Sequence, residues 1–229
     1  MATENVWQRA DDLTVRLFRV TCGLDLPCRD QWPKVVAVFL TQANERLASV
    51  ILLLRKNHRS SAVIVTRSLF ELAVNLAYIA KNIERRLPCY LRHGGNLLTK
   101  EEAELLQRRM RDNPHSVALE IVPGHAWTPL KRMCTGLGPG WVTEYRTFYR
   151  YASIPTHAGA FTLETSYEQL VKQQPMPASD KATLLITAIA FHLRIAEIAA
   201  KTFPKEVNPE TVKSLTNEWR DLHSELSKQ

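Results

Sequence analysis

The residues best suited to chemistry in this chain lie in one segment rich in tyrosine and arginine. Residues 145–157 read YRTFYRYASIPTH, with tyrosines at 145 and 149 and a serine at 153. In a helix, this interval of four places Tyr145, Tyr149 and Ser153 on one face. Their hydroxyl groups can donate hydrogen bonds to an anionic substrate. We therefore expect these three side chains to position a substrate such as a phosphate group.

Arg150 and His157 follow in the same segment and could act on that phosphate. A histidine exchanges a proton near neutral pH, and an arginine stabilises charge that develops on phosphoryl oxygens. On an unbroken helix the two residues would lie roughly 10 Å apart along the axis, and Pro155 disturbs the helix between them. They can converge through the long arginine side chain, the kink or a second subunit. The alternative is a packing or capping role for His157 and a solvated Arg150.

A second group of polar residues lies on a helix that is otherwise apolar. Arg67, Glu71, Asn75 and Tyr78 fall at intervals of four, four and three, so they form one stripe along the helix. Buried charges must be paired or lie in a solvated cleft. Arg67 and Glu71 either form an ion pair that sets the packing of the bundle, or they support an active cleft together with Asn75.

The helices that carry these residues are the most apolar parts of the chain. The segments 60–86 and 181–203 are predicted to be the two buried helices of a bundle, apolar on most faces. Either is long enough to suggest a membrane span. Charges at Arg67 and Glu71 would be costly in hydrocarbon, so we expect no membrane association.

Composition supports a helical fold. The chain has 229 residues and only 8 glycines, which argues against a turn-rich β fold or a glycine-rich nucleotide loop. We expect an all-α bundle forming a single domain over residues 1–229. Within it, residues 88–140 are expected to be a more irregular, partly helical insertion.

The net charge and the cysteine and histidine content limit the classes of binding partner and the cellular compartment that we expect. The formal net charge is +7, which is compatible with RNA binding but also with simple solubility. The four cysteines form no C-x-x-C pair and the histidines show no metal-ligand spacing. We therefore expect reduced thiols, no metal and no cofactor. The first residues show no signal-peptide pattern, and we expect a cytoplasmic protein.

The motifs resemble a bacterial helical family of unknown function. The resemblance rests on Arg67-Ser-Leu-Phe-Glu71 in an apolar helix, on Trp127, and on the spacing Tyr-x-x-x-Tyr-Arg-x-x-Ser-x-x-x-His that ends at His157. It covers roughly residues 40–165. It implies an all-helical fold and leaves the function open.

The segment from Arg150 to His157 is also similar to the R-x(4–6)-H signature of the HEPN superfamily. HEPN domains are helical bundles, often dimeric, and many are metal-independent endoribonucleases of bacterial defence systems. The resemblance implies that His157 acts as general acid or base for attack by a ribose 2′-hydroxyl, and that Arg150 stabilises the phosphoryl charge. Tyr151 and Pro155 depart from the usual pattern.

Three functions are consistent with these residues. The first is a HEPN-like, RNA-cleaving or RNA-binding homodimer of a defence or stress system. The second is a non-catalytic interaction module whose Arg67, Glu71, Tyr149 and His157 side chains form a structural polar network. The third is an enzyme that binds a small molecule between the central helices.

Overall fold

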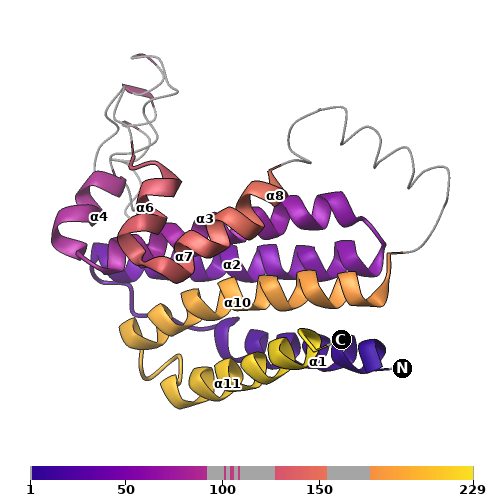
Figure 1. Ribbon diagram of the computed structural model, residues 1–229. Helices are drawn as coiled ribbons and strands as arrows, with labels where there is room; N and C mark the ends of the chain where they lie inside the picture. Colours follow the sequence, from indigo (N-terminus) through magenta and orange to yellow (C-terminus); the bar gives the residue numbers. More distant parts are fainter. Residues whose placement is uncertain are drawn as a thin grey trace.

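Every regular element described is a helix, which confirms the prediction of an all-α fold. The computed structural model describes residues 2–91, 127–153 and 176–228, with a few single positions between 101 and 108. The longer helices are α1 (Ala2–Thr21), α2 (Gln31–Arg55), α3 (Arg59–Ala80), α4 (Ile83–Leu91), α6 (Leu130–Leu137), α7 (Pro139–Glu144), α10 (Ala178–Thr202) and α11 (Pro209–Leu226), shown in Figure 1.

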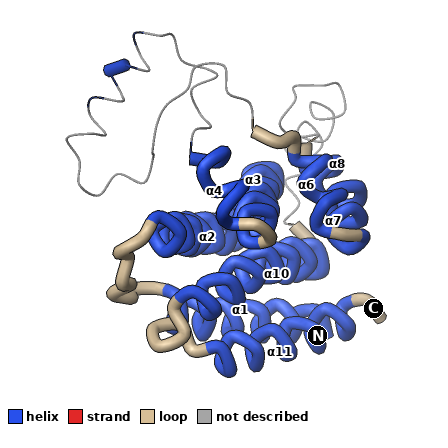
Figure 2. Tube along the Cα trace, turned by 90° about the vertical axis from the view of Figure 1, so that its left-hand side faces the viewer, coloured by secondary structure: helices blue, strands red, loops and turns tan. Residues whose placement is uncertain are grey.

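Helix α10 is the centre of the bundle. It packs against α1 and α11 on one side and against α2 and α3 on the other. In Figure 2 these helices form successive layers, with α6, α7 and α8 beside α3. The sequence explains the position of α10, because apolar residues cover most of its circumference and most of the helix is buried.

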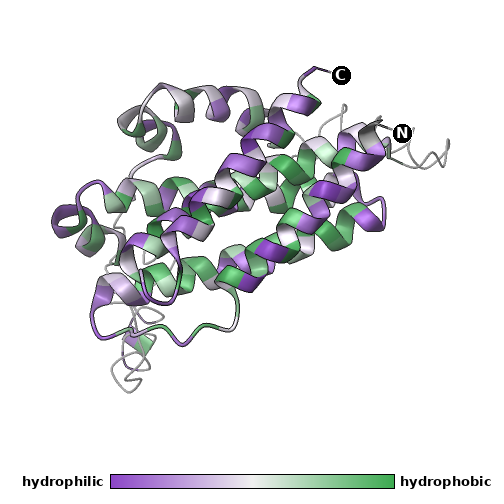
Figure 3. Ribbon diagram, turned by 90° about the horizontal axis from the view of Figure 1, so that it is seen from below, coloured by the Kyte–Doolittle hydropathy of each residue, from purple (hydrophilic) through white to green (hydrophobic). Residues whose placement is uncertain are grey.

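The outer helices α1 and α11 are amphipathic. Figure 3, which looks onto the side of α1 and α11, shows hydrophilic and hydrophobic residues alternating along these two helices. Val6, Leu13 and Leu17 of α1 are fully buried, and arginines on the outer side pair with glutamates of α11, as in Arg9–Glu225. The two helices therefore shield one face of α10 from water.

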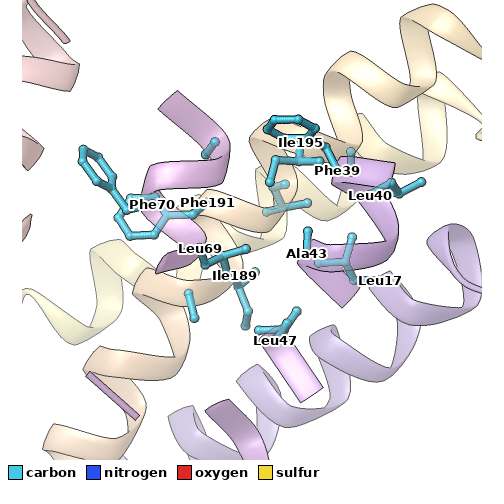
Figure 4. Packing of buried hydrophobic residues seen from close by; sticks show 14 of the residues in the cluster. Leu17, Phe39, Leu40, Ala43, Leu47, Leu69, Phe70, Ile189, Phe191 and Ile195 are labelled. Atoms are coloured by element: carbon cyan, nitrogen blue, oxygen red, sulfur yellow. The ribbon is translucent and has the colours of Figure 1, made fainter. Parts of the chain in front are cut away.

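The hydrophobic core is continuous through the described helices. Phe70 of α3 and Phe191 of α10 lie at its centre, with ring centroids 5.0 Å apart, and Leu40 and Leu47 of α2 are buried in the same cluster (Figure 4). Helix α2 contributes a buried stripe comparable to that of α3. The core thus includes a buried stripe from α2 in addition to the two buried helices that the sequence indicated.

Among the helices that the structure describes, three are long and apolar enough to cross a membrane, judged by length and composition alone: α2, α3 and α10. Here they pack against one another, and 72% of the apolar window of α10 is buried inside the bundle. The corresponding buried shares of α2 and α3 are 44% and 50%.

The helix expected over 60–86 ends earlier than the sequence indicates. It stops at Ala80, and Lys81 and Asn82 separate it from α4. The Asn82 side chain accepts a hydrogen bond from the backbone N–H of Arg85 at 3.2 Å, which is the role of an N-cap. This local cap starts a new helix and overrides the apolar periodicity. The helix expected over 181–203 is α10, which begins at Ala178.

The expected insertion, 88–140, is mostly helical where it is described, with non-helical residues at 127–129 and at Gly138. Residues 88–91 complete α4, and α6 and the start of α7 fill 130–140. After α7 the chain continues without a break into η2 (Tyr145–Tyr149) and α8 (Arg150–Ala152). Helix η2 is a π-helical turn, in which the N–H of Arg150 bonds to the carbonyl of Tyr145. Such wide turns are frequent at functional sites.

Candidate functional site

Tyr149, Arg67 and Glu71 form a triangle of two hydrogen bonds and one ion pair that connects η2 with α3. Arg67 Nη2 donates to the Tyr149 hydroxyl at 2.8 Å, and this hydroxyl donates to Glu71 Oε1 at 3.0 Å. Arg67 Nε lies 3.3 Å from the same Glu71 oxygen. The ion pair between Arg67 and Glu71, one of the two arrangements expected from the sequence, is therefore present. Its contacts with Tyr149 attach the tyrosine-rich segment to α3.

The triangle holds the Tyr149 hydroxyl in its protonated form. Burial is the main reason why the pKa of Tyr149 is raised; the Glu71 carboxylate raises it further, while the bond from Arg67 opposes the shift. The Arg67 guanidinium also lies 4.6 Å from the centroid of the Tyr149 ring. These contacts make Tyr149 a fixed anchor.

Asn75 extends the polar stripe toward Trp127. The Asn75 side-chain amide donates to the backbone carbonyl of Glu71 at 2.7 Å and accepts from the Trp127 indole N–H at 2.6 Å. The Trp127 ring packs edge-on against Tyr78 and Tyr90. This end of the stripe therefore holds the chain that leads into α6.

Tyr145 and Ser153 lie on the same helix as Tyr149 and contact it. The Tyr145 and Tyr149 rings are stacked, with centroids 5.2 Å apart and planes at 17°. The Ser153 hydroxyl donates to the backbone carbonyl of Tyr149 at 2.7 Å. The predicted common face of the two tyrosines is thus confirmed. The Ser153 hydroxyl donates its proton to a backbone carbonyl of its own helix.

A cavity of about 650 Å³ lies between α6 and the continuous helix α7–η2–α8. Its lining includes three cations, an aromatic ring and neutral side chains: Lys131, Cys134, Thr135, Val142, Tyr145, Arg146 and Arg150. Lys131, Arg146 and Arg150 are exposed to solvent, so their charges are available to a ligand. The cavity is a cationic site that opens to the surface.

The Glu144 carboxylate, which lies next to this cavity, is paired with an arginine from α10. Glu144 forms a two-pronged ion pair with Arg194 of α10, and the Arg194 guanidinium lies 4.1 Å from the centroid of the Trp141 ring. Burial, with a smaller contribution from the Glu144 charge, raises the pKa of the Cys134 thiol to about 11. Cys134 is therefore a neutral wall of the cavity at physiological pH.

The structure brings together most of the residues singled out from the sequence. Arg67, Glu71 and Tyr149 form one network, and Arg150 lies at the cavity that Tyr145 also lines. His157 lies outside the described residues.

Sequence reasoning missed Lys131, Glu144 and Arg194 as parts of this region. Arg146 and Arg150 are four residues apart and so share a helix face, but no local signal links α6 or α10 to that face. Among residues 2–91, 127–153 and 176–228, no cluster of three or more His, Cys, Asp or Glu side chains could hold a metal ion.

Comparison with known proteins finds one family model that matches part of the chain, over residues 34–122. No curated protein and no solved structure matches it. The matched segment contains most of α2 and all of α3 and α4, and thus the Arg67–Glu71 pair. The segment 145–157 lies beyond it. Residues 34–122 match the model of DUF5677, a family of unknown function, in agreement with the resemblance of the Arg67–Glu71 helix to an uncharacterised helical family.

Proposed function

We propose that this protein is a HEPN-like RNA-cleaving protein of a bacterial defence or stress system, acting in the cytoplasm without a membrane span. The observation that carries the proposal is the position of Arg150, which shares one cavity with Arg146 and Lys131. Clustered cations bind phosphodiesters by neutralising phosphate charge and releasing counterions. The net charge of +7 adds a long-range attraction for RNA.

The proposed reaction is a transesterification that needs no metal ion. The 2′-oxygen of a ribose forms a bond to the adjacent phosphorus, and the P–O5′ bond breaks. His157 takes the 2′-hydroxyl proton, and the departing 5′-oxygen receives a proton from solvent. Arg150 stabilises the charge on the phosphoryl oxygens. The products are a 2′,3′-cyclic phosphate and a 5′-hydroxyl.

We also propose that the protein works as a homodimer. Arg150 and His157 stand seven residues apart, with Pro155 between them, and a second subunit is one way to bring the two side chains to one phosphate. A mixture of Arg150→Ala and His157→Ala subunits tests this: regained cleavage in the mixture supports sites shared between subunits, and inactive mixtures argue for sites within one chain.

A second candidate function is a non-catalytic interaction module. The observation that favours it is the Arg67–Glu71–Tyr149 triangle, in which two hydrogen bonds join η2 to the ion pair on α3. In this role the network would specify how η2 packs on α3, and RNA would not be cleaved.

Cleavage of labelled single-stranded RNA of random sequence, in EDTA, separates the two candidates. Cleavage that leaves a 2′,3′-cyclic phosphate, and that disappears in His157→Ala and Arg150→Ala, supports the enzyme. Arg220→Ala is the matched control, because Arg220 is exposed on α11 and bonds only to Asn217 among the described residues. Uncut RNA with all proteins folded would overturn the cleavage proposal.

Stability gives an independent readout for His157. If His157 is a catalytic group, His157→Ala should leave the free energy of unfolding within about 1 kcal/mol of the wild-type value. A larger loss would support the structural role, because buried partners left without hydrogen bonds cost about 1–3 kcal/mol.

A further inference from the structure

We infer that the cavity between α6 and α7–η2–α8 binds one nucleoside monophosphate unit, with the phosphate at Lys131, Arg146 and Arg150 and the base against Tyr145. The inference rests on the proposed RNA function and identifies the part of the substrate that this cavity holds.

The charges around the cavity favour an anion. Lys131, Arg146 and Arg150 form no ion pair with any acidic side chain in the described ranges, whereas Arg67 and Arg194 each have a glutamate partner. Three exposed cations gathered around one space repel one another, and an anionic ligand relieves that repulsion. Guanidinium groups are well suited to phosphate, because they present several N–H donors in one plane.

The neighbouring acid does not neutralise these cations. Glu144 directly precedes Tyr145 in the sequence, so its carboxylate could compete with a phosphate for the arginines. Arg194 binds both carboxylate oxygens of Glu144 and thereby leaves the cavity cations unpaired. The neutral Cys134 and Thr135 side chains on α6 add no negative charge.

The aromatic wall extends the site beyond a bare phosphate. Tyr145 lines the cavity, and its ring is held in place by stacking on Tyr149, which is itself bonded to Arg67 and Glu71. A rigid aromatic ring offers a stacking surface to any nucleobase. The volume of about 650 Å³ lies in the range of small-ligand sites and exceeds what a phosphate ion requires.

Calorimetric titration of the full chain with AMP, adenosine and inorganic phosphate, in EDTA at low salt, tests the inference. AMP should bind at least ten times more tightly than phosphate or adenosine, because only AMP uses both parts of the site. Arg146→Gln and Lys131→Gln should each weaken AMP binding about tenfold. Tyr145→Leu should weaken AMP binding but not phosphate binding, and Arg220→Gln should change neither.

Three outcomes overturn the inference: no binding of AMP up to 10 mM, equal affinity for AMP and phosphate, or AMP binding that Arg146→Gln and Lys131→Gln leave unchanged. Thermal melting verifies that each variant is folded, which we expect for Arg146→Gln and Lys131→Gln because both of these side chains are exposed. RNA cleavage without AMP binding would refute this site and leave the proposed function standing. AMP binding without RNA cleavage would support the site and refute the cleavage.

Discussion

Arg194 and Glu144 form a two-pronged ion pair that joins the central helix α10 to the helix carrying the tyrosine-rich segment. Each side chain is 28% exposed, so the pair is partly shielded from water and salt. Trp141 packs against the guanidinium and further restricts it. This ion pair holds α7 against α10. It also occupies the carboxylate of Glu144, which directly precedes the cavity residue Tyr145 in the sequence.

Breaking that pair should destabilise the fold more than breaking a surface pair. We expect Arg194→Met to lower the free energy of unfolding by about 1–3 kcal/mol, because Glu144 loses its partner in a partly buried position. Arg16→Met is the matched control: its pair with Glu218 is more exposed, at 45% and 32%, and should be worth less than about 1 kcal/mol. Urea denaturation measures both, and equal losses would contradict the assigned importance of the pair.

Removal of one hydroxyl should loosen the attachment of η2 to α3. Tyr149→Phe leaves Arg67 and Glu71 without their shared partner, and we expect a loss of about 1–2 kcal/mol in the free energy of unfolding. Tyr151→Phe, at a site 49% exposed, should have no measurable effect. A cycle with Glu71→Gln should show coupling between the two positions; simple additivity would mean that the triangle contributes little.

The aromatic cluster around Phe70 should be sensitive to truncation. Phe70 is fully buried, and its ring contacts Trp141, Tyr149 and Phe191. Phe70→Ala should cost about 3–5 kcal/mol, from lost burial and the cavity left behind. Leu52→Ala should stay within about 0.5 kcal/mol, because Leu52 is 60% exposed. A small loss at Phe70 would show that the surrounding rings collapse into the space.

Stability should fall at acid pH because of one buried histidine. His192 is fully buried, and its Nε2 lies 2.7 Å from Asn44 Oδ1. Because Asn44 Nδ2 donates to the Thr21 carbonyl, Oδ1 must accept, so Nε2 carries the proton. Burial lowers the pKa of His192 to about 3, which places the neutral form in the folded state at neutral pH.

The sign of the pH effect follows from that lowered pKa. An unfolded histidine has a pKa of about 6.5, so between about pH 6.5 and 3 the unfolded state binds more protons. The stabilisation is complete above about pH 6.5 and declines as pH falls, by at most about 1.4 kcal/mol per pH unit. Denaturation at pH 7.5, 6 and 5 should show this slope. The slope of the free energy of unfolding against pH should diminish in His192→Gln and persist in the control His58→Gln, because His58 is exposed. An unchanged slope in His192→Gln would assign the effect to other groups.

Helical periodicity alone was sufficient to predict the helical class and the position of one central helix. The helix expected over 181–203 corresponds to α10, because apolar residues at helical spacing reflect purely local geometry. The common face of Tyr145 and Tyr149, and the Arg67–Glu71 pair, are also confirmed. These are contacts between residues four apart on one helix, which the geometry of the helix dictates wherever it is placed.

Tertiary structure decided which of these faces meet. Tyr149 and Arg67 are 82 positions apart, and Arg194 and Glu144 are 50 apart, so no local pattern could pair them. The gathering of Lys131 with Arg146 and Arg150 depends on how α6 packs beside the continuous helix α7–η2–α8. Sequence periodicity specifies the face that a helix buries; the partner of that face is selected only when all helices pack together and every buried polar group must find a hydrogen bond.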